Sequence, residues 1–333
     1  MRQTIFIFCF FALMQPLFAE KKDWLIDGSS YKAEVNLSPD KKQVELTNGL
    51  LRRIFSLTPN GATIALDNLM TGQNELRAVR PEAVLVINGK EYPIGGLAGQ
   101  PVHNFLTKDM LSDMQLCDSA FVLTDYEIDE TKEHFPWKPN ESWISNKYSW
   151  PAPGKRVTFT YKAPRKIADE CKGLTVRIVY ELYDGAPILS KWIKIENNGQ
   201  KAVTLDSFKS EVLALVETAP KVHYGEPHEV RMMAQEPGHY TKDYRKKPVQ
   251  TDAPRDYIDR FTQLFVVTDY AMGGDMEAMK DNPAVRWVFD HPEYEFTGIR
   301  YYGQYKPARL EVAPLLGPAE KIAVGESFTS YRT

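Results

Sequence analysis

Short segments in which apolar and polar residues alternate dominate this chain. In the clearest of them, one strand face carries an unbroken apolar series: Leu174, Val176, Ile178, Tyr180 and Leu182. A period of two is typical of a β-strand with one buried face. Asp184-Gly185 follows and predicts a tight hairpin, after which a second strand is expected from Ile188 to Glu196.

The same alternation recurs along most of the sequence. It predicts further strands at Leu50–Leu57, Ala83–Ile87, Val157–Tyr161, Val203–Val216, Phe261–Val267 and Arg309–Val312. Helical spacing is confined to short segments at Thr107–Leu116 and Asp275–Met279, which are too few to cover a parallel sheet. The pattern therefore predicts an all-β fold, a large antiparallel β-sandwich with a few short helices.

The N-terminus carries a different pattern. Arg2 precedes an apolar run from Ile5 to Met14, and a break at Pro16 leads to Ala19. This arrangement predicts a secretory signal peptide over residues 1–19, with cleavage after Ala19. The run is shorter than the roughly 20 apolar residues that span a bilayer, so we expect no membrane span. The expected product is exported, periplasmic or secreted, with residues 20–333 forming one continuous domain.

Net charge and the absence of certain motifs argue against two classes of function. The 333 residues include 41 Lys plus Arg against 44 Asp plus Glu, which leaves a net charge of -3. Nucleic-acid binding needs an excess of clustered cations, so that partner is not expected. The chain also lacks the glycine-rich phosphate loops and the G-x-S-x-G nucleophile turn. We therefore expect neither a nucleotide nor any other cofactor.

Two cysteines, Cys117 and Cys171, remain after removal of the signal peptide with Cys9. In an exported protein they can pair, and a disulfide closing a loop of that size would contribute about 4 kcal/mol in the chain-entropy account. The alternative is two separately buried thiols. The sequence leaves both open.

The longest segment without strand pattern, residues 133–154, concentrates aromatic side chains. Trp137, Trp143, Tyr148 and Trp150 alternate there with lysine and asparagine residues. Flat aromatic faces beside amide and ammonium donors suit a sugar ring, whose C–H groups stack while its hydroxyls take hydrogen bonds. These four residues are the predicted substrate-binding residues. The alternative interpretation is that they hold a long loop against the sandwich or form an interface with another domain.

A polar cluster follows at residues 223–244 and contains His223, Glu226, His228, Glu229 and His239. Histidine and glutamate can bind zinc, but Gly225 and Pro227 disfavour the helix that the H-E-x-x-H motif needs, so we expect no metal. Glu217, Glu226 and Asp243 can form carboxylate pairs only if the fold sets their separation, which the sequence does not determine.

Particular strings add a resemblance to a known family. These are VELTNGLLRRIFSL, PNGATIALDNLMTGQNELRAVRPEAVLVINGKEYPIGGL, VYELYDGAPILSKWIKIENNG and VGESFTSYRT. They resemble the N-terminal β-supersandwich module of secreted glycoside hydrolase family 36-like α-galactosidases, over most of residues 44–333. The most specific pieces are Tyr183-Asp184-Gly185 with Ser190-Lys191-Trp192, and Gly325-Glu326-Ser327-Phe328. The resemblance implies a galactose mutarotase-like supersandwich.

In those enzymes a (β/α)₈ barrel after this module supplies both catalytic aspartates, so the resemblance carries no catalytic residue onto this chain. It implies a noncatalytic module that packs on the barrel and edges its sugar cleft, with the barrel in a longer or split gene product as a partner. A free-standing protein that binds a galactoside or polysaccharide is the first alternative. The second is a mutarotase-like aldose epimerase, with His223 or His228 acting with Glu226.

Overall fold

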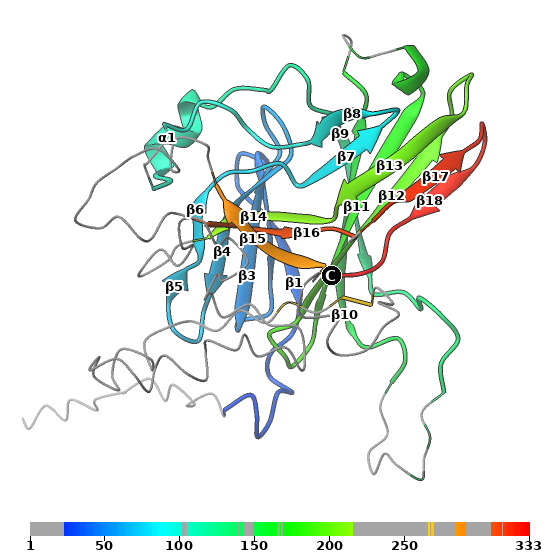
Figure 1. Cartoon of the computed structure of the whole chain (residues 1–333). Coiled ribbons are helices and arrows are strands. Elements are labelled where there is room, and N and C mark those ends of the chain that lie inside the picture. Colours follow the sequence, from blue (N-terminus) through cyan, green and yellow to red (C-terminus); the bar gives the residue numbers. More distant parts are fainter. Residues whose placement is uncertain are drawn as a thin grey trace, which may run out of the picture.

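The computed structural model describes residues 23–101, 105–138, 140, 142, 149–164, 167, 169–215, 266, 268–269, 284–290, 308–314 and 316–333. In these residues the fold is an antiparallel β-sandwich, which confirms the predicted class (Figure 1). One short helix, α1 (Lys108–Asp113), lies inside the predicted helical segment, and a 3₁₀ turn, η1, covers Asp169–Cys171. The second predicted helix, at 275–279, lies outside the described residues.

Four sheets make up the described fold, and every strand pairing within them is antiparallel. The first has the order β1 (Glu34–Leu37), β2 (Gln43–Thr47), β3 (Leu51–Ser56), β4 (Ala62–Asn68), β5 (Gln73–Asn74). The second has the order β18 (Ser327–Thr329), β12 (Leu189–Asn197), β11 (Leu174–Tyr183), β10 (Gly154–Lys162), β9 (Val122–Glu130). The third has the order β17 (Pro318–Ile322), β13 (Val203–Lys209), β7 (Ala83–Ile87), β8 (Lys90–Ile94). The fourth has the order β15 (Val285–Phe289), β16 (Ala308–Val312), β14 (Glu211–Leu215), β6 (Leu76–Ala78).

The main hydrophobic core lies where the first three sheets meet. The apolar face predicted for β11 lies in this core. Its five residues are each at most 1% exposed: Leu174, Val176, Ile178, Tyr180 and Leu182. Phe55 of β3 contacts the rings of Phe159 and Tyr180, with centroids 4.8 Å away in each case. Alternation along the strands thus places one apolar row of the second sheet against the first sheet.

Asn88-Gly89 forms a two-residue turn between β7 and β8, and this dipeptide is typical of such turns. Both residues have positive φ, 51° and 74°, and Ile87 pairs with Lys90 across the two-residue turn. This is the geometry of a primed hairpin turn, which carries the chain directly from β7 into β8.

The connection after β11 is longer than the predicted two-residue hairpin. Gly185 has φ of 76°, as expected, but β12 begins only at Leu189. The Asp184 carboxylate accepts hydrogen bonds from Ala33 N at 2.8 Å and Lys32 Nζ at 3.0 Å, so it holds the segment before β1. Gly28 approaches Gly185 so closely that an added Cβ would lie 2.4 Å from the Gly185 carbonyl oxygen.

The strand predicted at 203–216 is divided between two sheets. β13 ends at Lys209 and pairs with β7 and β17, whereas β14 begins at Glu211 and pairs with β6 and β16. Ser210 between them is fully buried, and its amide donates to Val312 O at 2.7 Å. The chain therefore crosses from the third sheet to the fourth at this single residue.

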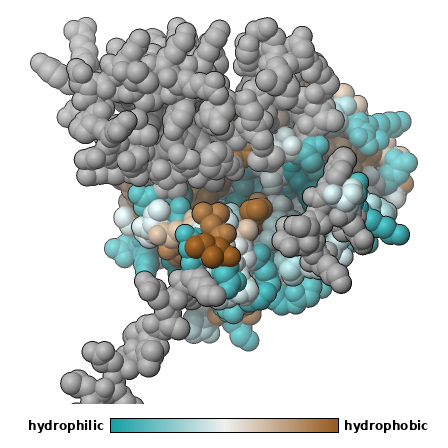
Figure 2. Space-filling model, turned by 90° about the horizontal axis from the view of Figure 1, so that it is seen from below, coloured by the Kyte–Doolittle hydropathy of each residue, from teal (hydrophilic) through white to brown (hydrophobic). Residues whose placement is uncertain are grey.

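Hydrophilic residues predominate on the described part of the face in Figure 2, and hydrophobic residues gather near its centre and show again toward its edges. Among the described residues, no helix has the length and apolar character needed to cross a membrane.

Candidate functional site

The described part of the predicted aromatic loop forms a cluster of three rings between β9 and β10. The ring centroid of Trp150 lies 5.4 Å from that of Trp137 and 5.1 Å from that of Phe135. Phe135 is 48% exposed and Trp137 is 37% exposed, while Trp150 is half-buried. We call Phe135, Trp137 and Trp150 the aromatic strip. The other two predicted site residues, Trp143 and Tyr148, lie outside the described residues.

Hydrogen bonds fix both ends of this loop. Thr131 Oγ1 donates to Ala152 O, and the Thr131 amide donates to Gly154 O, which closes the base of the loop. Trp150 Nε1 donates to Phe135 O at 3.0 Å. The indole N–H is therefore used to hold the strip together, which leaves ring faces as its means of contacting a ligand.

The sheet face beneath the loop carries a polar row across β10, β11 and β12. Glu181 is 2% exposed and accepts from Arg156 Nε at 2.8 Å, while its second oxygen accepts from the Tyr183 hydroxyl at 3.0 Å. The Lys132 amide at the start of the loop donates to the same carboxylate at 3.2 Å. Glu181 thus ties the loop to the sheet, and burial raises the pKa of Tyr183.

A second contact joins the loop to this face. The His134 ring meets the Trp192 ring edge-on with centroids 4.4 Å apart, and the Arg156 guanidinium lies over Trp192 at 5.3 Å. Burial lowers the pKa of His134, and the nearby positive charge of Arg332 lowers it further. His134 is therefore neutral at pH 7 and contributes to the packing of the loop.

An ion pair borders the aromatic strip. The Arg332 guanidinium lies 5.8 Å from the centroid of the Phe135 ring. Its Nε donates to Asp269 Oδ2 at 3.1 Å, and the Asp269 side chain is 48% exposed. Sequence reasoning did not single out Arg332, Asp269 or Phe135 as a group, because residues 135, 269 and 332 are far apart in the sequence and only the fold brings them together.

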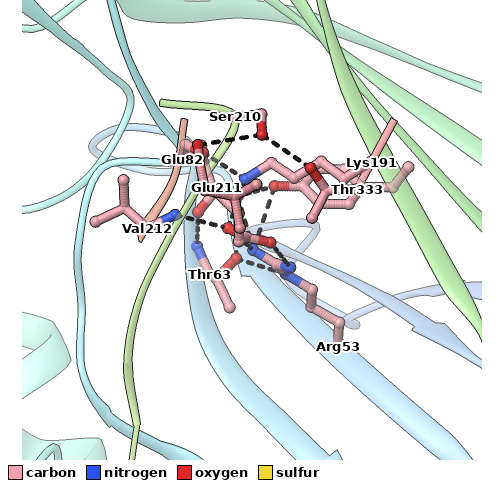
Figure 3. A network of polar contacts seen from close by, with 10 residues as sticks. Arg53, Thr63, Glu82, Lys191, Ser210, Glu211, Val212 and Thr333 are labelled. Atoms are coloured by element: carbon pink, nitrogen blue, oxygen red, sulfur yellow. Dashed lines mark hydrogen bonds and ion pairs between the residues drawn. The ribbon is translucent and has the colours of Figure 1, made fainter. Parts of the chain in front are cut away.

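A second polar cluster lies inside the sandwich (Figure 3). Its charged side chains, Arg53, Glu82, Lys191 and Glu211, come from different sheets and connections and point toward one another. Arg53 Nη1 donates to Glu211 Oε2 at 2.7 Å, and Lys191 Nζ donates to Glu211 Oε1 at 2.7 Å. We call these four residues, with Thr63 and Tyr180, the buried ionic network.

The charges of this network balance and its groups are bonded to each other. Two cations face two carboxylates, and the Tyr180 hydroxyl and Thr63 Oγ1 both donate to Glu82. Burial alone would raise the pKa of Glu211, but the charges of Arg53 and Lys191 lower it to about 2. Burial lowers the pKa of Lys191 and raises that of Tyr180 well above its usual value. A closed, neutral network with satisfied partners is a structural connection between sheets rather than an open reactive site.

The fourth sheet has its own ionic cluster. Asp290, whose side chain is fully buried, accepts from Arg80 Nε at 2.7 Å and from Arg77. The Arg80 and Arg77 charges hold the pKa of Asp290 below its usual range, against the effect of burial. Glu311 is bonded in the same way to Lys209 and Arg309.

The disulfide considered for Cys117 and Cys171 is not supported, because both are free thiols in the structure. Cys171 is 1% exposed within the main core, where η1 ends. Cys117 Sγ instead lies 3.4 Å from the Ser119 hydroxyl. The two thiols are thus separate, as the alternative has it, but only Cys171 is buried, and Cys117 is partly exposed.

The polar cluster with His223, Glu226, His228, Glu229 and His239 lies outside the described residues, as do Glu217 and Asp243. The same holds for the strand predicted at 261–267, apart from Val266. Within the described part of the chain, no group of three or more His, Cys, Asp or Glu residues is placed to hold a metal ion.

Comparisons with known proteins give only remote likeness. No family model and no curated protein matches the chain. In structure it is similar to the GH36 α-galactosidase AgaB from Geobacillus stearothermophilus, with 13% identity and a TM-score of 0.31 over 57% of this chain and 26% of that one. The galactosidase domain of the α-galactosidase-sucrose kinase AgaSK has 10% identity and a TM-score of 0.40, over 90% of this chain and 41% of that one.

A galactose mutarotase-like protein from Clostridium acetobutylicum has 11% identity and a TM-score of 0.37, over 91% of this chain and 98% of that one. The chain thus spans 26% and 41% of the two α-galactosidase structures. Likeness at this level adds no support for an activity, so the functional conclusion depends on the residues of the site.

Proposed function

We propose that this chain is a noncatalytic β-sandwich that binds carbohydrate through the aromatic strip. The observation that carries the proposal is the exposure of Phe135 and Trp137 on a loop that is fixed to the sheet. Exposed aromatic faces are costly in water unless a partner covers them, and a sugar ring offers the matching C–H surface.

Polar groups beside the strip fit the same ligand. The Asp269 carboxylate accepts hydrogen bonds from the amide and Nε of Arg332, and each of its oxygens keeps capacity for a hydroxyl donor. Sugar recognition needs this combination of a stacking face with a few oriented polar groups. The buried ionic network offers no comparable surface, since its carboxylates are at most 7% exposed.

The resemblance of the sequence strings suggests a finer role. We propose that, in a longer or split α-galactosidase-like hydrolase, the module packs on a catalytic barrel and the aromatic strip edges the sugar cleft. In a free-standing protein the same strip is the carbohydrate platform. The epimerase alternative depends on His223, His228 and Glu226, and it stays a prediction. Export, with cleavage after Ala19, also stays a proposal, which N-terminal sequencing of the mature protein tests.

The test is a binding measurement on the Trp137→Ala variant of the whole chain. Loss of one stacking face is expected to weaken binding of a galactoside or polysaccharide about fivefold, or about 1 kcal/mol. Phe105, which is 57% exposed and lies outside the loop, provides the matched control, and Phe105→Ala is expected to leave binding unchanged.

Thermal unfolding distinguishes binding from a structural role. Truncation of a fully buried Trp costs about 3 to 5 kcal/mol, whereas the loss at exposed Trp137 is expected to be about 1 kcal/mol or less. If Trp137→Ala leaves binding unchanged and lowers stability by several kcal/mol, the aromatic strip is a structural feature and the proposal is wrong.

A further inference from the structure

We propose that the aromatic strip binds a single soluble chain of uncharged sugars, with successive sugar units on successive rings. This inference rests on the proposed function, because it specifies the ligand of the same surface. It excludes two other carbohydrate classes, namely isolated monosaccharides and flat crystalline polysaccharides.

The spacing of the rings indicates a ligand of more than one sugar unit. Trp137, Trp150 and Phe135 follow one another with centroid separations of 5.4 and 5.1 Å. A pyranose ring is about as large as one six-membered aromatic ring, so one sugar covers one face. Covering Trp137 and Phe135 at the two ends of the strip therefore requires more than one sugar unit.

The tilt of the rings favours a single sugar chain over a flat crystalline surface. The planes of Trp137 and Trp150 differ by 60°, and those of Phe135 and Trp150 differ by 44°. A flat crystalline surface stacks on coplanar rings, because every contact must lie in one plane. Rings that turn from one to the next instead match a chain whose sugar planes also turn.

The balance of charge around the strip favours uncharged sugars. The described ionic groups around the strip include three ion pairs, Arg332 with Asp269, Arg156 with Glu181 and Lys132 with Asp129, and the loop adds Glu133 and Lys138, one charge of each sign. These pairs leave no excess of either sign to attract a uronate or a sulfated sugar. At the Phe135 end, the Arg332–Asp269 pair presents donors and acceptors that suit neutral hydroxyl groups.

The experiment is a chain-length series, measured by calorimetry on the whole protein. Galactose, melibiose and raffinose form one series, and glucose, maltose and maltotriose form another. Each added unit that stacks on a further ring is expected to tighten Kd about three- to tenfold. Trp137→Ala and Phe135→Ala change exposed positions and are each expected to reduce the gain from the longest sugar, while Phe105→Ala keeps it.

The outcomes separate this inference from the proposed function. If no member of either series binds, and polysaccharides do not bind either, the proposed function fails. If the monosaccharide binds as tightly as the trisaccharide, carbohydrate binding stands and the chain-length inference is overturned. Retention on microcrystalline cellulose, or tighter binding of polygalacturonate than of the neutral sugars, would likewise overturn the ligand class.

Discussion

Glu211 is the anion that connects both cations of the buried ionic network, so its charge can be tested directly. The change Glu211→Gln keeps the shape of the side chain and removes its charge. Arg53 Nη1 and Lys191 Nζ, each 2.7 Å from a Glu211 oxygen, then share Glu82 as the remaining carboxylate of the network. Both cationic side chains are 2% exposed, so water cannot solvate the unpaired charge. Breaking a buried pair in this way costs about 3 to 5 kcal/mol.

The assay is urea unfolding, followed by tryptophan fluorescence and by circular dichroism so that coincident transitions establish two-state behaviour. Lys191→Met is the matched second variant, because it removes one cation. In the double variant, Arg53 and Glu82 remain as a balanced pair. We therefore expect the double variant to be more stable than the sum of the two single losses predicts, by at least about 1 kcal/mol. Additive losses, or a Glu211→Gln cost below about 1 kcal/mol, would refute the reasoning.

Three further outcomes are expected. Because the pKa of Glu211 falls from 4.5 to about 2 on folding, its contribution is complete above pH 4.5 and is lost as the pH drops toward 2; it is worth about 3 kcal/mol. The loss of stability between pH 4.5 and pH 2, measured by circular dichroism, should be smaller in Glu211→Gln than in the unchanged protein. An equal loss in both proteins would contradict this. Thiol titration of denatured, unreduced protein that begins at Glu20 should find two thiols, Cys117 and Cys171, whereas finding none would restore the disulfide. Asp290→Asn should cost about 2 to 4 kcal/mol because Arg80 and Arg77 lose a buried anion; exposed Asp269→Asn is the control, and equal thermal shifts would contradict the role of burial.

Local patterns predicted the strands well where apolar residues occupy every second position. Leu174, Val176, Ile178, Tyr180 and Leu182 do so in β11, and each lies in the main core, although the opposite face of this strand is also mostly buried. The Asn88-Gly89 turn was also predictable, since a two-residue turn with positive φ is encoded in that dipeptide. The break at Ser210 was not, because no glycine, proline or Asx-Gly turn signal separates β13 from β14, which pair with different distant strands.

The aromatic strip was predictable only in part. Trp137 and Trp150 were recognised from the concentration of aromatic residues in one loop, but Arg332, which lies beside Phe135, comes from a distant part of the sequence. The buried ionic network had a local signal that sequence reasoning missed. Arg53 lies between Leu51 and Phe55 on alternate positions of β3, and Lys191 occupies the corresponding row of β12. A charged residue in an apolar row indicates a buried partner, although the sequence does not identify that partner.

The order of the strands has a consequence for the synthesis of the protein. β17 pairs with β13, as Val203 with Ile322, and β18 pairs with β12, as Ile195 with Phe328. Both sheets therefore lack a strand until residues far along the sequence have left the ribosome. The apolar faces around Ile195 and Leu205 stay incompletely covered on the nascent chain, since long-range pairing forms late. A chaperone that binds unfolded chains has the longest access to this protein during that interval.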